Sequence, residues 1–300
     1  MRYHYYPGCS LEGTARAYDR SSRAVLDALG LELLEIPDWT CCGASAAGAA
    51  GPLLALTLPA RNLALAERRD PDLEILAPCS ACYLNLRHAV QAMRARPEEA
   101  ARIREVLRVE DLHPRGRTRV RHLLDVLAFD VGAERLASRV ERPLRGMRIA
   151  PYYGCQCLRP YADFDDPEQP ISMEPLIRAL GAEVFRWRSG GSCCGASLSA
   201  TRRAAGLSRI ASILEDARGA DAVATVCPMC QMNLEAFQEA AGRHAGGDLT
   251  CDVLYLPQVI GLAMGMAEKA LGLQENLAFS AERWAGVPLR GGAQKGGGRR

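Results

Sequence analysis

The sequence predicts an α/β protein made of two pseudo-symmetric, duplicated domains, each a small parallel sheet flanked by helices and each carrying a Cys-Cys-Gly motif. Three observations predict this fold class. One cysteine pattern occurs twice, strand-like and helix-like segments alternate in the same order in both halves, and 300 residues are enough for two domains that each bury a core. We expect the domains at residues 1–145 and 146–285, and a disordered tail at residues 286–300.

The repeated pattern contains five cysteines in each half and ten of the twelve cysteines in the chain. The first copy consists of Cys9, Cys41, Cys42, Cys79 and Cys82, and the second of Cys155, Cys193, Cys194, Cys227 and Cys230. Neighbouring residues also match, because Tyr-x-Gly-Cys, Cys-Cys-Gly-Ala-Ser and Cys-x-x-Cys-x-x-Asn-Leu recur at offsets of 146, 152 and 148 residues. These three matches indicate an internal duplication.

The first half is expected to alternate strands with helices. The pattern predicts strands at residues 3–6, 31–36 and 73–77, helices at 16–29 and 53–69, a helix from 83 onward, an exposed helix and connection at 94–119, and a closing strand at 119–123. The cysteines follow strand ends, and in parallel sheets that edge collects ligands because loops and helix N-termini converge there.

The second half repeats this order. We expect strands at residues 148–152, 183–187, 222–226 and 252–256, a helix at 173–180, a helix after the Cys193-Cys194 pair, and a packed helix at 259–273. This alternation favours a parallel sheet in each half.

Composition limits the class of protein. The chain is 48% apolar and 24% charged, which is typical of a globular protein, and a net charge of +2 gives no global field for nucleic acid. The first cysteine motif follows Met1 directly with no secretory signal, so we expect a cytoplasmic protein without a transmembrane segment. Residues 41–60 carry no charge, but Pro52 and Pro59 interrupt them, and we expect a buried loop and helix start there.

In a reducing setting, grouped cysteines are metal ligands or redox thiols more often than disulfides. A Cys-x-x-Cys pair between a strand and a helix also describes a thioredoxin-like redox motif, and a disulfide between the adjacent Cys41 and Cys42 would be strained. Structural zinc and a cubane [4Fe-4S] cluster each take four thiolates, whereas each repeat offers five. Five thiols therefore indicate a larger or irregular cluster, or one redox-active spare thiol per site.

Other candidate ligands are few. The five histidines show no paired ligand spacing and are expected on the surface or in the core. Cys251 is expected to be a small buried hydrophobic residue. Cys157 stays open, because it lies two residues from Cys155 and could compete for iron.

Taken together, these residues resemble the cysteine-rich CCG domain that occurs twice in the B-type subunit of heterodisulfide reductase and its bacterial relatives. The resemblance covers residues 1–275. Beyond the ten cysteines, it includes Pro59-Ala60-Arg61-Asn62-Leu63, Val120-Arg121-His122, Tyr153-Gly154-Cys155, Pro167-Glu168-x-Pro170 and Gly261-Leu262-Ala263-Met264-Gly265.

The resemblance implies two noncubane [4Fe-4S] clusters, one held by Cys9, Cys41, Cys42, Cys79 and Cys82, the other by Cys155, Cys193, Cys194, Cys227 and Cys230. It further implies an oxidoreductase acting on sulfur groups, active within a complex, that splits a disulfide in a cavity between the halves. Electrons would come from a subunit with cubane [4Fe-4S] clusters and from a flavin subunit. Gln156, Cys157 and His122 are candidates for that cavity or for contacts behind the ligands.

Two positions depart from the methanogen members of that family. Gln156 stands where they usually carry His, and Gly43 where Pro commonly follows the first Cys-Cys pair, so the resemblance is to bacterial relatives acting on other thiols. An alternative function is a non-catalytic electron-transfer subunit of a lactate or glycolate oxidase or of a succinate:quinone reductase-type complex. A zinc-held structural adaptor is a further alternative.

Overall fold

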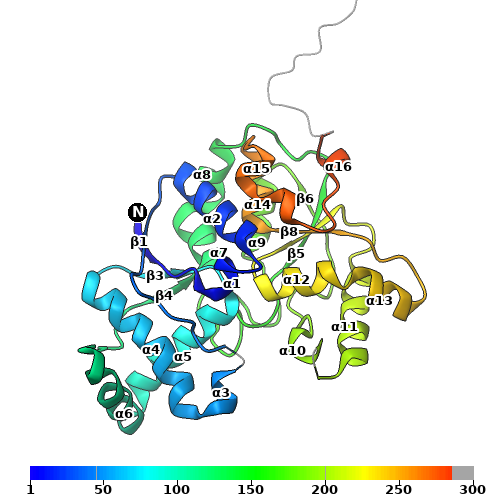
Figure 1. Ribbon diagram of the computed structural model, residues 1–300. Coiled ribbons are helices and arrows are strands. Elements are labelled where there is room, and N and C mark those ends of the chain that lie inside the picture. The colour runs from blue at the N-terminus through cyan, green and yellow to red at the C-terminus, as the bar shows by residue number, and fades with distance from the viewer. Residues whose placement is uncertain (45, 200, 286–300) are drawn as a thin grey trace, which may run out of the picture.

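Two four-stranded parallel sheets form the centre of the protein (Figure 1). The computed structural model describes residues 1–44, 46–199 and 201–285, so the predicted tail at 286–300 lies outside the described residues. The first sheet has the order β2 (Glu32–Glu35), β1 (Arg2–Tyr5), β3 (Ile75–Ala77), β4 (Val120–His122). The second has the order β6 (Glu183–Val184), β5 (Arg148–Tyr152), β7 (Ala222–Thr225), β8 (Asp252–Tyr255). The two orders correspond strand by strand, which confirms the predicted duplicated α/β fold.

Helices flank both sheets. In the first half they are α1 (Gly8–Glu12), α2 (Arg16–Ala28), α3 (Ala47–Ala50), α4 (Pro52–Arg69), α5 (Ser80–Ala95), α6 (Pro97–Leu107), η1 (Arg108–Glu110), α7 (Leu123–Asp125), the π-helical turn η2 (Val126–Val131) and α8 (Gly132–Ser138). In the second half they are α9 (Met173–Ala179), α10 (Ala196–Ser199), α11 (Arg203–Asp216), α12 (Pro228–Ala236), α13 (Gln238–Ala245), α14 (Leu256–Ala263), α15 (Glu268–Leu271), η3 (Leu273–Glu275) and α16 (Ala281–Ala285).

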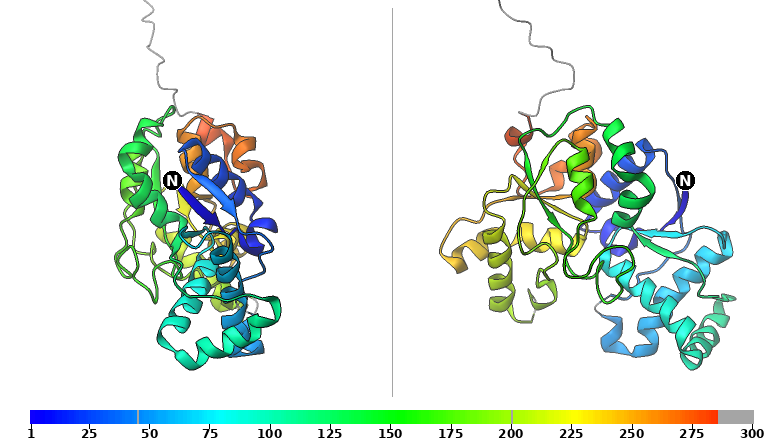
Figure 2. Two further views of the ribbon diagram at one scale, coloured as in Figure 1. Left: turned by 90° about the vertical axis from the view of Figure 1, so that its left-hand side faces the viewer. Right: turned by 180° about the vertical axis from the view of Figure 1, so that it is seen from behind.

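The two halves share a core. One cluster of buried apolar side chains contains residues from both halves, including Tyr18 and Leu26 of α2 and Val259 and Ile260 of α14. A second cluster, around Val223 and Leu234, belongs to the second half alone. Figures 1 and 2 show α14 and α15 lying beside α2, so the end of the chain covers the beginning. The boundary expected near residue 145 falls in the connection between α8 and β5 and stays a prediction.

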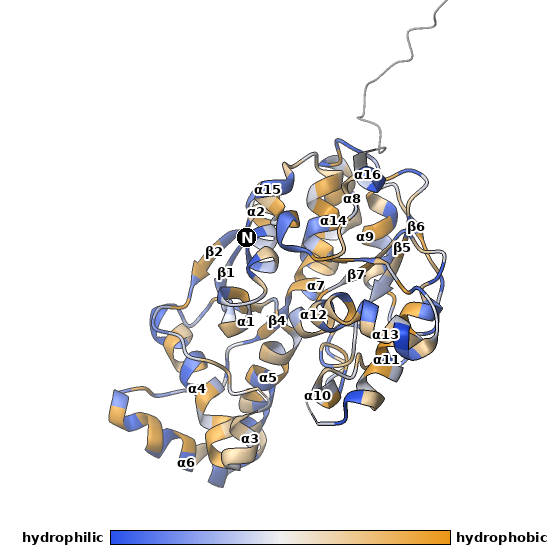
Figure 3. Cartoon of the chain, turned by 45° about the vertical axis from the view of Figure 1, so that its right-hand side comes forward, coloured by the Kyte–Doolittle hydropathy of each residue, from blue (hydrophilic) through white to orange (hydrophobic). Residues whose placement is uncertain are grey.

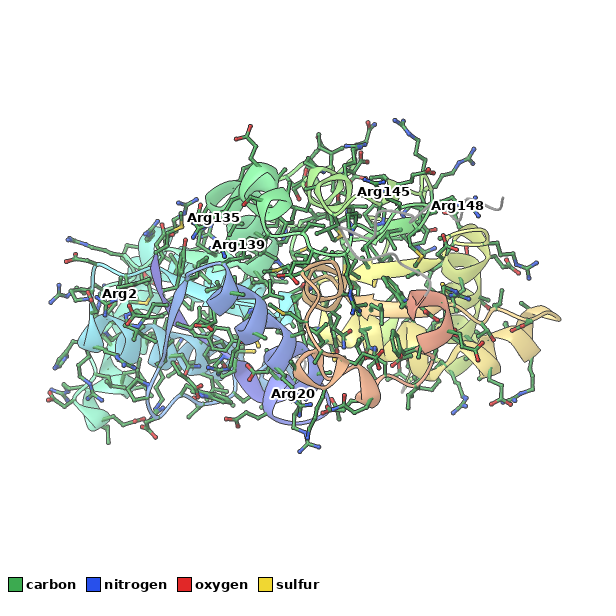
Figure 4. The ribbon with its side chains drawn as sticks, turned by 90° about the horizontal axis from the view of Figure 1, so that it is seen from above. Arg2, Arg20, Arg135, Arg139, Arg145 and Arg148 are labelled. Carbon is green, nitrogen blue, oxygen red and sulfur yellow. The ribbon has the colours of Figure 1, made fainter. Side chains whose placement is uncertain are left out.

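The strands begin far apart and end close together. Arg2 and Arg148, the first residues of β1 and β5, lie at opposite sides of the molecule in the view from above (Figure 4). At the other edge, the register pairs Ala77 with His122 and Thr225 with Tyr255, so the segments that follow β3 and β7 emerge beside β4 and β8. The cysteine motifs follow these carboxyl ends.

Three elements differ from the sequence prediction. β6 ends at Val184 instead of residue 187, because the Pro151 carbonyl accepts a hydrogen bond from the Trp187 indole at 3.0 Å instead of continuing the ladder. α5 begins at Ser80, so Cys82 lies in its first turn. The helix predicted at 259–273 is divided into α14 and α15, because Gly265 has a φ of +75° that ends helical geometry.

The uncharged run at residues 41–60 forms a loop, α3 and the start of α4. These elements are coloured largely as hydrophobic in Figure 3, yet Ala49, Ala50 and Leu54 are exposed, so the expectation of a buried loop was wrong for this part of the run. In the described ranges, none of the helices combines the length and the apolar character needed to cross a bilayer.

Candidate metal-cluster sites

Each half gathers its five cysteine thiols at the carboxyl edge of its sheet. In the first half, the Cys9 and Cys41 sulfurs lie 3.6 Å apart, and those of Cys42 and Cys82 lie 3.5 Å apart. Cys79 is the N-cap residue of α5 and contacts the Cys82 thiol. We call these five residues the first thiol group. All five are free thiols, with Cys9 and Cys41 exposed and the other three buried.

The second half repeats this arrangement. Cys155 contacts Cys193, and Cys230 contacts both Cys194 and Cys227. Cys227 is the N-cap residue of α12, as Cys79 is of α5. We call these five residues the second thiol group. They are also free thiols, with Cys193 exposed and Cys155 half-buried.

Matched hydrogen bonds hold the Cys-Cys loops. Asn85 Nδ2 donates to the Cys42 carbonyl at 3.2 Å, and Asn233 Nδ2 to the Cys194 carbonyl at 2.7 Å. The Tyr6 hydroxyl donates to the Thr40 carbonyl and the Tyr152 hydroxyl to the Ser192 carbonyl, both at 2.7 Å. The tyrosines beside the first cysteines therefore brace the loop backbone and donate no hydrogen bond to sulfur.

Two glycines let the backbone approach the Cys-x-x-Cys sulfurs. Gly8 and Gly154 have φ values of +69° and +70°, a region that residues with a Cβ rarely adopt. A Cβ on Gly8 would lie 2.7 Å from the Cys82 sulfur, and a Cβ on Gly154 would lie 3.0 Å from the Cys230 sulfur. The glycines preceding Cys9 and Cys155 thus keep space open beside the innermost thiols.

The pKa of some of these thiols is lowered, which favours the thiolate form. The hydrogen bond from Cys155, followed by the Gly195 amide and the Arg209 and Arg159 charges, lowers the pKa of Cys193 to about 5. A hydrogen bond from Cys82 lowers the pKa of Cys42 to about 7, and one from Cys230 does the same for Cys227. Hydrogen bonds to Cys193 and Cys194 raise the pKa of the partner thiols Cys155 and Cys230, so each pair favours one thiolate and one thiol.

Buried side chains join the two thiol groups. The Tyr18 hydroxyl lies 3.1 Å from the Pro78 carbonyl and 3.1 Å from the Val226 carbonyl, the groups just before Cys79 and Cys227. The Ser80 hydroxyl donates to the Val226 carbonyl at 3.3 Å and also bonds to the Cys227 thiol. The first motif therefore contacts the second directly.

The predicted cavity residues occupy different positions. His122 is fully buried, its Nε2 lies 3.2 Å from Ser80 Oγ, and burial lowers the pKa of this histidine to about 3. Cys157 is buried, and its thiol donates to the Tyr153 carbonyl at 3.1 Å, so in this structure it belongs to the core. Gln156 is half-buried. Tyr18 and Ser80 lie beside the backbone that precedes Cys79 and Cys227, and the cavity that the resemblance implied stays a prediction.

Aromatic side chains complete the contact between the two halves. The sequence motifs did not reveal them. Tyr18 of the first half stacks on Tyr255 of the second, with ring centroids 4.2 Å apart. Phe164 of the second half stacks on His122 of the first, at 6.1 Å. Tyr18 and Phe164 are separated by 146 residues, the offset of the first cysteines, so aligning the two repeats could have identified this exchange.

An open pocket lies beside the exposed thiols of the first group. It has a volume of about 540 Å³ and is lined by Cys9, Glu12, Glu35, Ile36, Pro37, Asp38, Trp39, Thr40 and Cys41. Cys251 is buried in the second core cluster, as predicted, and its thiol donates to the Asp252 carbonyl at 3.5 Å.

Comparisons with known proteins agree with the repeat. The model of the CCG cysteine-rich domain matches residues 3–87 and 149–235. The chain is 37% identical to the 8-methylmenaquinol:fumarate reductase membrane anchor subunit of Wolinella succinogenes, over 91% of this chain and 95% of that protein. It is 30% identical to a protein of Archaeoglobus profundus that is named for its likeness to the B-type subunit of heterodisulfide reductase, over 91% and 94%.

A solved structure shows the same fold. The crystal structure of a hypothetical protein from Helicobacter pylori superposes with a TM-score of 0.75 at 18% identity, covering 93% of this chain. The chain spans about half of that protein, 52% of its length. With two matched CCG domains and relatives aligned over most of its length, this chain belongs to the family of CCG cysteine-rich proteins that includes the B-type subunit of heterodisulfide reductase.

Proposed function

We propose that this chain is the iron-sulfur subunit of a heterodisulfide reductase-like complex, and that it carries out two-electron thiol/disulfide chemistry with two noncubane [4Fe-4S] clusters. The first cluster is assigned to the first thiol group and the second to the second thiol group. The observation that carries this proposal is the pairing of two five-thiol groups, both reachable from solvent and joined by the buried contact at Tyr18 and Ser80.

The donor set fits such clusters. Each group offers five free thiols, one more than zinc or a cubane requires. In the described part of the chain, no three His, Cys, Asp or Glu side chains converge on a point suited to one metal ion. Gly8 and Gly154 leave room beside Cys82 and Cys230. A larger polynuclear cluster uses these features better than a single ion does.

The chain's own residues position and expose the thiols. Asn85 and Asn233 hold the Cys-Cys loops, and the pocket beside Cys9 and Cys41 gives a small molecule access to the first group. Clusters bound here would supply one-electron centres, and cleaving a disulfide takes two electrons, so a linked pair suits that reaction. We assign electron delivery to a partner subunit with cubane clusters and to a flavin subunit, and the chain's location to the cytoplasm.

A second candidate is an electron-transfer subunit without substrate chemistry, in a complex of the quinol:fumarate reductase type. The 37% identity to the membrane anchor subunit from Wolinella succinogenes favours it. The two candidates share the clusters and differ in whether a disulfide reacts on this chain.

Iron and acid-labile sulfide in anaerobically purified protein test the cluster assignment. We expect about eight of each per chain for two four-iron clusters. Cys42→Ala and Cys194→Ala should each lower the iron content to about half. Cys251→Ser should leave it nearly unchanged, because Cys251 belongs to neither five-cysteine motif and its thiol donates to the Asp252 carbonyl. Zinc without sulfide, or full iron in both alanine variants, would contradict the assignment.

Turnover separates the two candidates. With a reduced viologen dye as electron donor, wild-type protein should reduce small disulfides, and both alanine variants should lose this activity. A wild-type protein with about eight irons that reduces no disulfide would favour the electron-transfer subunit.

A further inference from the structure

Different charged side chains lie beside the two thiol groups. Matching backbone hydrogen bonds identify which residue of one half corresponds to which residue of the other. The Gly13 amide donates to the Cys9 carbonyl at 3.0 Å, and the Arg159 amide donates to the Cys155 carbonyl at 3.0 Å. Arg159 therefore occupies in the second half the position that Gly13 occupies in the first. At this position the second half has a guanidinium, and the first half has a glycine without a side chain.

The Arg159 side chain is directed toward the second group. Its guanidinium donates to the Gly191 carbonyl at 2.5 Å and to the Pro167 carbonyl, and Gly191 lies two residues before Cys193. Its carboxylate partner is Glu168, at 3.5 Å. Because the Glu168 side chain is 79% exposed, water screens this ion pair, and Glu168 neutralises little of the Arg159 charge. A positive charge thus stays beside Cys155 and Cys193.

A second guanidinium lies on the other side of Cys193. Arg209 Nε donates to the Cys193 carbonyl at 3.0 Å, and its Cβ lies 3.3 Å from where a Cβ on Gly195 would be. At the corresponding Gly43 of the first half, the nearest side chains are those of Ala47 and Leu58, which carry no charge. At these two positions the second group has cations, whereas the first has glycine and apolar side chains. Arg23 and Arg61 also lie near the first group, where each is paired with a carboxylate of the pocket.

Carboxylates lie beside the first group instead. Glu12 is exposed, lines the pocket with Cys9 and Cys41, and has no ion-pair partner among the residues that the structure describes. Its counterpart Leu158 is buried in the core. Glu35 and Asp38 line the same pocket, each paired with an arginine.

Other influences on the two groups are nearly matched. The Gly43 amide donates to the Cys41 sulfur and the Gly195 amide to the Cys193 sulfur, both at 3.4 Å. Exposure differs mainly at one position, where Cys9 is exposed and Cys155 half-buried. Each group also has its own side-chain donor to sulfur, which is Asn85 to Cys42 at 3.7 Å in the first and Ser80 to Cys227 in the second. Charge is the main difference that remains between the groups.

We infer that the cluster held by the second thiol group has the higher reduction potential, so that one electron added to the oxidised protein comes to rest there. This inference rests on the function proposed above and adds the direction of electron flow. Reduction adds one negative charge to a cluster, which nearby guanidinium groups stabilise and a nearby carboxylate destabilises. If both clusters are bound, an electron that entered at the first group would move to the second, where Arg159 and Arg209 would stabilise the added negative charge.

Redox titration with electron paramagnetic resonance tests this order. Anaerobic wild-type protein is titrated with dithionite, and Cys42→Ala and Cys194→Ala identify which step belongs to which group. The step at higher potential should disappear in Cys194→Ala. Arg209→Gln should lower the potential of that step by about 59 mV. For a one-electron couple, this shift is a tenfold change in the equilibrium for electron transfer between the groups.

Matched variants isolate the effect of charge. Arg209→Lys keeps the positive charge and should keep the wild-type potential. Arg178→Gln removes a cationic side chain from α9, where Arg178 pairs with Glu174, and should change the potential of neither step. Glu12→Gln should raise the step of the first group.

Iron and sulfide are measured on the same samples. Iron-free protein would remove both the proposed function and this inference. Protein with iron in which the higher step belongs to the first group, or in which Arg209→Gln moves neither step, would overturn the inference alone.

Discussion

At the scale of single residues, His122 is a neutral polar group enclosed at the contact between the halves. Its Nδ1 accepts a hydrogen bond from the Leu124 amide at 3.2 Å, which leaves the proton on Nε2, beside Ser80. Burial lowers its pKa to about 3, below the value of about 6.5 expected for the unfolded chain.

This pKa predicts acid sensitivity. Between pH 6.5 and 3 the unfolded chain binds a proton that the folded protein does not, so stability is complete above pH 6.5 and falls as the pH decreases. Protonation of His122 in the unfolded chain should lower the free energy of unfolding by about 3 kcal/mol at pH 4. Thermal unfolding at several pH values should show a weaker pH dependence in His122→Gln. The exposed His113, changed to Gln, is the control and should reproduce the wild-type profile.

Gly8 supports a second residue-scale prediction. Gly8→Ala should displace the Cys82 sulfur and strain a positive φ, and so lower the iron content of anaerobic protein to about half. Gly48→Ala, on exposed α3 with no atom near its Cβ, should keep full iron. Full iron in Gly8→Ala would mean that the close approach to Cys82 does not matter for assembly.

At the scale of elements, α2 is the helix that joins the halves. It supplies Tyr18, whose ring stacks on Tyr255 and whose hydroxyl lies between the carbonyls that precede Cys79 and Cys227. Arg87 of α5 adds a second link through Asp163, to which it donates at 2.6 and 2.8 Å. These contacts fix the position of one cysteine motif relative to the other.

Removing the Tyr18 hydroxyl should weaken this link without removing the stack. Tyr18→Phe removes the buried hydrogen bond from the Tyr18 hydroxyl to the Pro78 carbonyl. This loss should lower the free energy of unfolding by about 1–3 kcal/mol. Denaturant unfolding measures this change. Tyr161→Phe, whose half-buried ring packs on His88, serves as the control and should change stability little. Equal stability of both variants would show that the bridge contributes nothing.

At the scale of the whole molecule, the shared core predicts cooperative unfolding. Because α14 and α15 cover α2 and one core cluster spans both halves, the chain should unfold in a single calorimetric transition. Two transitions, one for each duplicated half, would contradict this expectation and would support domains that fold independently.

The sequence was enough to predict the repeat, a parallel sheet in each half, and the gathering of each set of five cysteines. It was not enough to predict the contact between the halves. Tyr18 and Phe164 belong to no motif, and their exchange depends on how two sheets pack, which local periodicity does not encode. The division of the last helix at Gly265 depends likewise on a single backbone angle.

The covering of α2 by the end of the chain has a consequence for synthesis. A Cβ on Gly272 would lie 2.8 Å from the Ala17 Cα, so residues at the two ends of the described chain are in close contact. A nascent chain that has just left the ribosome through β4 still lacks α14 and α15, and its α2 remains uncovered. The first half therefore reaches its final packing only after α14 and α15 have been synthesised, and any group that its thiols bound before then would be held by an incompletely packed half.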